Sequence, residues 1–233
     1  MPLPKIDMPT YELKLPSNGQ KVKYRPFTVK EEKILLIAQE SKDSEQIINA
    51  IKQIVNNCLL EGTIDDLALV DLEYTLIMIR SKSIDNLVKF EIEDPDTEEK
   101  ITLELDLTNV KIERPEGHTN KIEVSDQYTL FLKYPSADDF FGLLDDTKSE
   151  SEKNYNIMIS CLDKLASSED VYDFRDFTRK EIEDFVESLH NNVVKQIKSF
   201  FDTIPKVRHE VEYKNKNGEN KTFVIQGTQT FFM

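Results

Sequence analysis

Side chains that could carry out acid–base chemistry are few in this sequence and lie far apart. The three histidines are His118, His190 and His209, and none of them stands beside a nucleophile in a catalytic pattern. A general base must reach the proton it abstracts, and its ring is held by a further group. We therefore predict surface or structural roles for all three histidines.

Metal and thiol chemistry are equally weakly supported. A zinc site needs three or four converging Cys, His or carboxylate ligands. The sequence has no C-x-x-C or H-E-x-x-H, and its two cysteines, Cys58 and Cys161, lie on apolar faces of predicted helices. A free cysteine in that setting behaves as a small buried hydrophobic residue. We predict no metal, no disulfide framework and a reducing compartment.

Paired carboxylates, which glycosidases use for acid and nucleophilic catalysis, occur several times. Examples are Asp65-Asp66, Asp138-Asp139 and Asp145-Asp146. They fall in loops or before predicted helices, where capping and solvation account for them. The glycines form no G-x-G-x-x-G or Walker loop, so the sequence predicts no cofactor site. We predict no catalytic residue, and a carboxylate-based enzyme stays an alternative. The Phe and Tyr clusters fit a core better than a ligand pocket.

Composition narrows the class of protein. The chain has 233 residues, and its 44 acidic and 30 basic side chains give a formal net charge of −14. This balance argues against nucleic acid as the main partner, because phosphate binding needs a basic face. The N-terminus carries no apolar leader, and no apolar run approaches the roughly 18 residues of a membrane span. The length fits one large domain or two small ones.

The elements that would position these residues begin with hairpins and helices. Apolar and polar residues alternate around Asn18-Gly19, which predicts a β-hairpin over residues 11–25. A capping box at Thr28 opens a helix. Further helices are predicted over 44–59 and 69–82, and a second hairpin over 87–105. Together these elements predict a first α+β module over residues 11–112.

A second module is predicted after a polar linker at 113–120. Strands near 121–124 and 129–133 are followed by a helix opening at Ser136. The remaining expected elements are a helix carrying Tyr155 to Leu165, a capped helix from Thr178 that runs on or breaks and restarts through Phe201, and a hairpin over 211–225. The two halves share one order of elements, and Cys58 aligns with Cys161, so we predict an internal duplication; coincidence is the alternative.

The predicted fold is therefore α+β, with two similar modules in which β-hairpins flank a small helical bundle. The divisions are an extended arm at 1–10, modules at 11–112 and 121–227, the linker at 113–120 and an apolar tail at 228–233. Exposed apolar chain ends are adhesive. We predict partner contacts there; for the tail, packing into the protein's own core is the alternative. The contact residues are Pro2, Leu3, Pro4, Phe231, Phe232 and Met233.

A series of short segments, each weak by itself, runs in order along nearly the whole chain. The first half supplies Tyr11–Ser17, Val22–Phe27, Glu31–Lys33, Ile51–Cys58, Asp71–Tyr74 and Ile79–Ser83. The second half supplies Leu132–Ser136, Phe200-Phe201, Ile204-Pro205, Tyr213, Gly218 and Phe231-Phe232. In this order the chain resembles the baseplate hub protein family of T-even-type, long contractile-tailed bacteriophages.

This resemblance implies a non-enzymatic tail protein, either a hub subunit or a factor that assists hub assembly. Its implied partners are other baseplate hub proteins, and its implied location is the host cytoplasm during assembly and the virion tail baseplate. Some relatives carry a zinc-ribbon-like cysteine turn in the middle hairpin. Here the matching turn, 94–98, lacks cysteine, so we expect the hairpin to rely on its own packing. The alternative function is a chaperone-like binding module unrelated to tails. Homo-oligomerisation is left open.

Overall fold

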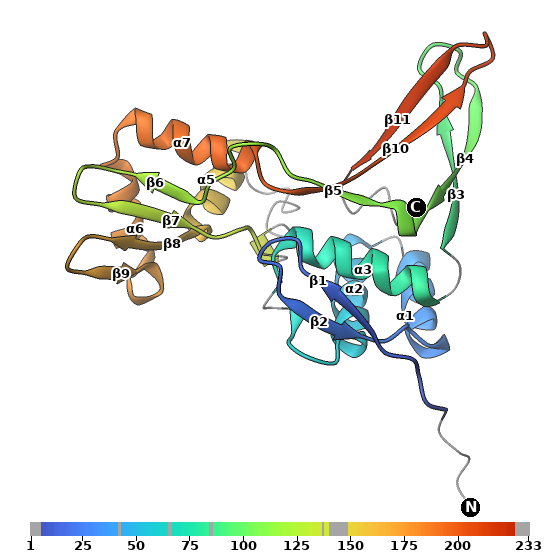
Figure 1. Ribbon diagram of the computed structural model, residues 1–233, viewed down its shortest axis with the longest axis horizontal. Coiled ribbons are helices and arrows are strands. Elements are labelled where there is room, and N and C mark those ends of the chain that lie inside the picture. The colour runs from blue at the N-terminus through green and yellow to red at the C-terminus, as the bar shows by residue number, and fades with distance from the viewer. Residues whose placement is uncertain are drawn as a thin grey trace, which may run out of the picture. The chain divides into compact units, whose positions relative to one another are not determined.

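The computed structural model describes residues 6–41, 43–64, 67–83, 86–136, 138–139 and 149–226. It confirms an α+β fold, with helices and small antiparallel sheets (Figure 1). The chain forms two compact units. Unit 1 comprises the chain up to Glu113 and again from Lys206, and unit 2 comprises Arg114–Pro205.

Unit 1 opens with a hairpin and three helices close to their predicted bounds. They are β1 (Tyr11–Lys14), β2 (Lys21–Tyr24), α1 (Val29–Ser41), α2 (Ser44–Cys58) and α3 (Leu69–Ser83). The predicted turn residue Gly19 has a φ of +72°, a conformation that glycine adopts without steric cost. α3 is buried on nearly all sides, since nine of its residues are buried, charged Asp71 and Glu73 among them. A helix apolar on one stripe only would leave its polar face in water, so α3 is the central helix of unit 1.

Two further hairpins complete unit 1 and lie side by side in Figure 1. Their elements are β3 (Leu87–Glu93), β4 (Lys100–Asp106), η2 (Leu107–Asn109), β5 (Lys111–Glu113), β10 (Lys206–Lys214) and β11 (Asn220–Gln226). β10 pairs with β11 on one side and with β5 on the other. One core cluster joins α3 to both hairpins, and its fully buried members include Leu107, Val207 and Ile225.

The final hairpin is therefore placed differently from the sequence prediction, which put it in the module at 121–227. It belongs to unit 1, because Lys206 pairs directly with Glu113 and the apolar side of β10–β11 packs on β3, β4 and α3. The residues of the predicted linker, 113–120, also differ from the prediction in their place in the fold. Unit 2 begins at Arg114, and His118 packs inside unit 2.

Unit 2 is a four-stranded antiparallel sheet, in the order β6-β7-β8-β9, with helices. Its elements are β6 (Lys121–Glu123), β7 (Thr129–Leu132), α5 (Glu150–Ser160), β8 (Leu162–Ala166), β9 (Val171–Asp173), η3 (Phe174–Asp176), α6 (Arg179–Glu187) and α7 (Asn191–Asp202). The core draws on every layer: Leu130 from β7, Ile159 from α5 and Phe200 from α7 are all buried.

In unit 2, one predicted helix ends earlier than expected, and the structure decides between two alternatives for another. The helix expected from Tyr155 to Leu165 ends at Ser160, because Leu162 and Leu165 instead pair with Leu132 and Leu130 of β7. Apolar residues three apart satisfy a helical period, and here a register shift in the ladder lets a strand use the same spacing. The helix from Thr178 breaks and restarts, giving α6 and α7.

A local arrangement recurs in the two units. In unit 1 the Arg25 amide donates to the Cys58 carbonyl, at 2.9 Å, and Tyr24 bridges to Leu59. In unit 2 the Lys133 amide donates to the Cys161 carbonyl, at 2.8 Å, and Leu132 pairs with Leu162. A capped helical turn starts three residues after each of these amides. The register is one residue off the sequence alignment of Pro26 with Pro135, and duplication of the whole module stays a prediction.

Candidate functional site

His118 has a structural position inside unit 2. Its ring nitrogens lie 2.9 Å from Thr203 Oγ1 and 2.8 Å from Tyr134 Oη. The ring stacks on Phe200, with centroids 5.2 Å apart. Burial, helped by nearby Arg114, lowers the pKa of His118. Both ring nitrogens are engaged by hydroxyl groups, and neither contact indicates acid–base catalysis. The geometry therefore supports a packing role for His118.

The other two histidines sit on secondary structure. His190 is the exposed N-cap residue of α7, and its side chain makes no capping bond. This is the beginning of a helix, not the C-terminal end that the helix dipole would favour for a cation. His209 lies in β10 opposite Ile225.

Both cysteines are buried and free. Burial raises the pKa of the Cys58 thiol to about 11. Burial, with the Asp139 carboxylate nearby, raises the pKa of the Cys161 thiol to about 12. The thiolate is the reactive form of cysteine, so these two side chains serve as packing at neutral pH.

The predicted carboxylate pairs have local roles where the structure describes them. Asp139 accepts hydrogen bonds from the amide and the hydroxyl of Ser136, at 2.8 and 2.7 Å, which caps a helical turn. Asp138 is exposed. The pairs at 65–66 and 145–146 lie outside the described residues. Within the described ranges, no three His, Cys, Asp or Glu side chains converge as metal ligands.

A buried carboxylate organises the start of α1. Glu31 is 2% exposed and accepts bonds from the amide and hydroxyl of Thr28, at 2.8 and 2.6 Å. Arg25 pairs with it at 3.2 Å. Burial opposes ionisation of Glu31, but these donors outweigh it and hold the pKa at about 2. The network fixes the entry of the chain into α1 after β2.

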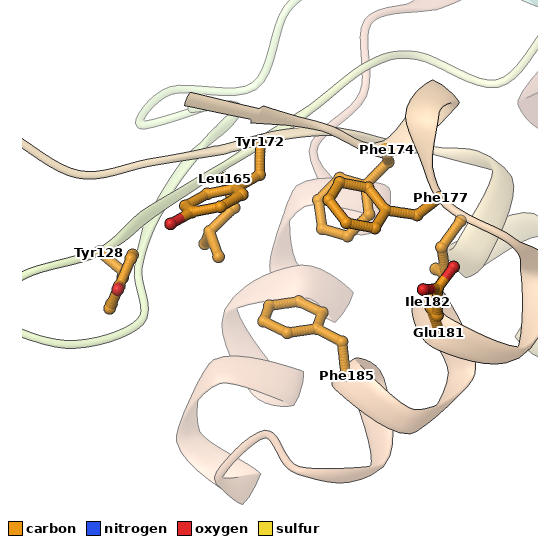
Figure 2. A pocket seen from close by; sticks show the side chains of 8 residues that line it. All are labelled: Tyr128, Leu165, Tyr172, Phe174, Phe177, Glu181, Ile182 and Phe185. Carbon is orange, nitrogen blue, oxygen red and sulfur yellow. The ribbon is translucent and has the colours of Figure 1, made fainter. Parts of the chain in front are cut away.

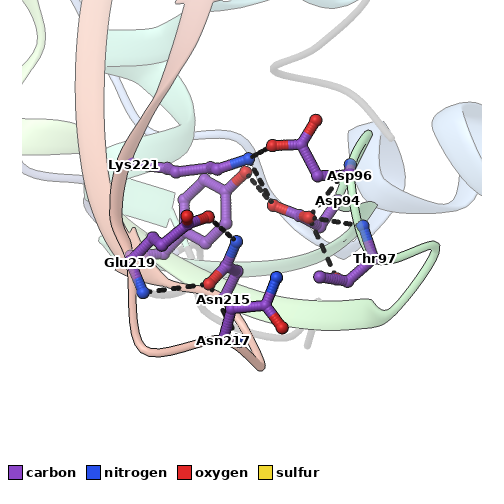
Figure 3. Close-up of polar contacts among 8 residues, drawn as sticks. Asp94, Asp96, Thr97, Asn215, Asn217, Glu219 and Lys221 are labelled. Atoms are coloured by element: carbon purple, nitrogen blue, oxygen red, sulfur yellow. Dashed lines mark hydrogen bonds and ion pairs between the residues drawn. The ribbon is translucent and has the colours of Figure 1, made fainter.

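A second buried carboxylate, Asp94, joins the two long hairpins of unit 1 (Figure 3). Within its own turn it accepts from the Thr97 amide and hydroxyl, both at 2.9 Å. From β10 and β11 it receives the Tyr213 hydroxyl, at 2.8 Å, and Lys221, at 3.7 Å; Lys221 also pairs with Asp96. Burial opposes ionisation, yet these bonds hold the pKa of Asp94 at about 2. The β3–β4 turn thus relies on a partner hairpin as well as on its own packing.

Unit 2 carries a groove lined mainly by aromatic rings (Figure 2), which we call the aromatic groove. Its volume is about 320 Å³. The rings of Phe174 and Phe185 pack at a tilt with centroids 5.5 Å apart, while Tyr172 and Phe177 stay 39% and 40% exposed. The lining residues are Tyr128, Leu165, Tyr172, Phe174, Phe177, Glu181, Ile182 and Phe185.

The aromatic groove follows from local rules at the start of α6. Thr178 and Glu181 form a complete capping box. Phe177 precedes the cap and Ile182 is the fourth helical residue, the two positions that form a hydrophobic staple. Sequence analysis found the capping box but took these aromatic residues for core, because a groove wall and a core face share the same periodicity. Strand β9, which supplies Tyr172, was not predicted.

The predicted partner contacts cannot be placed in this geometry. Pro2, Leu3 and Pro4 lie outside the described residues, and so do Phe231, Phe232 and Met233. The described helices include none long and apolar enough to cross a membrane.

Comparison with known protein families identifies the family of this chain. The model of the family described as T4 bacteriophage base plate protein matches residues 8–233. The chain therefore belongs to this family of phage baseplate proteins. The family suggests a structural, non-enzymatic role in the virion tail baseplate among other baseplate proteins, and it argues against a module unrelated to tails. Comparison with curated protein sequences and with solved structures gave no match.

Proposed function

We propose that this baseplate protein acts at the baseplate hub, as a hub subunit or as a factor that assists hub assembly. It works through protein–protein contacts and without catalysis. The observation that carries this proposal is the family match over residues 8–233. Local structural roles support it: His118 and the two cysteines pack inside the fold, and Asp94 joins two hairpins.

The proposed partners are other baseplate hub proteins, met in the host cytoplasm during assembly. The net charge of −14 favours partners with basic surfaces, because complementary charge steers encounter. The proposed contacts include the apolar chain ends. These are Pro2, Leu3 and Pro4 at one end and Phe231, Phe232 and Met233 at the other.

The test is a pull-down of the tagged full chain from infected host cells, combined with mass spectrometry of purified particles. A hub subunit binds hub proteins and is present in particles. An assembly factor binds hub proteins and is missing from particles. If the tagged chain binds baseplate proteins but none of the hub, the hub assignment is wrong.

The chain ends are tested by deletion. Removing residues 228–233 is expected to reduce recovery of hub proteins at least several-fold, because an apolar anchor is lost. The matched control replaces Phe231, Phe232 and Met233 with Leu, which keeps an apolar end and should retain binding. Full tail assembly after the deletion would disprove the contact at this end.

A further inference from the structure

Several large apolar side chains at the aromatic groove are exposed. Val171 on β9 is 66% exposed, and Tyr172 and Phe177 are each about 40% exposed. Large aromatic side chains dominate the binding energy of protein interfaces when a partner covers them. β9 is also the last strand of its sheet, which leaves one backbone edge without a neighbouring strand among the described residues.

The charge around the aromatic groove is predominantly negative. Residues 165–187, which supply most of its lining, carry eight acidic and three basic side chains, a net charge of −5. Two of the three basic side chains are ion-paired, Arg175 with Asp173 and Arg179 with Glu183. Glu181 is in the lining itself. The nearby carboxylate of Asp170 raises the pKa of Tyr172.

One neighbouring cation, Lys164, faces away from the aromatic groove. Lys164 precedes the lining residue Leu165 on β8, and successive strand residues point to opposite faces of a sheet. Its ammonium lies 5.1 Å from the Phe131 ring centroid, so that charge is engaged on the other face. An apolar groove with an acidic surround fits an apolar segment that carries its own positive charges.

We propose that the aromatic groove binds a polypeptide segment of a partner baseplate protein in which large apolar side chains are flanked by lysine or arginine. This rests on the proposed role in protein–protein contact, and it names the chemistry of the partner. The apolar side chains enter between Phe174, Phe177 and Phe185, and the cations meet Glu181 and Asp170. A neutral apolar segment lacks the second interaction, and an acidic segment is repelled.

The test uses the isotope-labelled full chain and three synthetic ten-residue peptides. The first places Phe and Leu between pairs of Lys, the second replaces Lys with Glu, and the third keeps Lys but replaces Phe and Leu with Ser. We expect only the first to bind below about 1 mM, with NMR shifts centred on Tyr128, Tyr172 and Phe185. Equal binding of the first and second peptides, shifts centred elsewhere, or no binding by any of the three would overturn the proposal.

Variants distinguish the groove from the surface in general. Tyr172→Ala and Phe177→Ala should each weaken the first peptide about tenfold or more. Leu36→Ala, which trims a 53% exposed side chain of α1, should leave binding unchanged. Asp170→Asn should weaken binding and flatten its salt dependence, with exposed Glu91→Gln as the charge control. A Tyr172→Ala chain that recovers hub proteins fully from cells would refute the groove while leaving the hub function standing.

Discussion

Cys58 is the last residue of α2 and Cys161 is the C-cap residue of α5, and burial raises the pKa values of their thiols to about 11 and 12. Their thiols should therefore react with a thiol reagent such as DTNB far more slowly in the native chain at pH 8 than in guanidinium. We expect a difference of at least a hundredfold, because both burial and protonation block attack. Rapid native labelling of either residue would contradict this packing role.

Asp94 predicts a loss of stability in acid. Its folded pKa of about 2 lies below the ordinary value of 3.8, so ionised Asp94 stabilises the fold above about pH 4. That contribution disappears as the pH falls through 4 towards 2. Asp94→Asn should lower the melting temperature at pH 7 and have a smaller effect at pH 2. Thermal melts across this range check it, with Asp126→Asn, on an exposed turn, as the control.

The lowered pKa of His118 predicts a loss of stability at a less acidic pH than that of Asp94. Its pKa is lowered on folding, so the unfolded chain binds more protons just below pH 6.5 and stability falls there. His118→Gln should reduce the drop in melting temperature between pH 7.5 and 5.5. The exposed His190→Gln serves as the control and should keep the full drop. An unchanged drop in His118→Gln would contradict this, because it would show that the pKa of His118 does not change on folding.

These residue roles were predictable only where the partner is near in sequence. Thr28–Glu31 and Thr178–Glu181 are capping boxes that the spacing reveals. The contact of His118 with Thr203 spans 85 residues, and that of Asp94 with Tyr213 spans 119. No local sequence pattern reveals contacts between residues so far apart along the chain. For this reason His118 was predicted to lie in a linker.

Among the elements, the N-cap of α6 allows a clean measurement. Thr178→Ala removes the hydroxyl that accepts from the Glu181 amide, and it should cost about 1 kcal/mol of unfolding free energy. Denaturant unfolding measures this change. Ser149→Ala, at the matching box of α5, should cost a similar amount. Ser168→Ala in an exposed turn should change stability by less than about 0.5 kcal/mol.

Element types followed from periodicity where burial was one-sided. The first two hairpins and α2 lie close to their predicted ranges because a single apolar face sets the period. The final hairpin begins five residues earlier than predicted, at Lys206. The boundary at Cys161 was missed because the strand pairing of Leu162 depends on β7, about 30 residues earlier. The groove residue Tyr172 escaped prediction for the same reason, since β9 is a short strand defined by its neighbour β8.

On the scale of the whole molecule, unit 2 is inserted between two paired strands of unit 1. Glu113 and Lys206 are direct partners, and Arg208 pairs with Glu113 at 2.8 Å. Replacing residues 114–205 with Asn-Gly should therefore close a β5–β10 hairpin and leave unit 1 folded. Cooperative unfolding and dispersed NMR signals would confirm this. Val207→Asp in the same short chain should abolish both, because Val207 is fully buried.

This inserted topology sets an order of events on the ribosome. Val207 and Ile225, which complete the core of unit 1, are synthesised after all of unit 2. At roughly 5–20 residues per second, the apolar faces of α3 and β3–β4 wait about 5–20 s for these strands. Unit 2 holds its whole core within one continuous segment, and it can fold during that pause. In the nascent chain, the core of unit 2 can therefore be complete before the core of unit 1, although unit 1 contains the N-terminal part of the sequence.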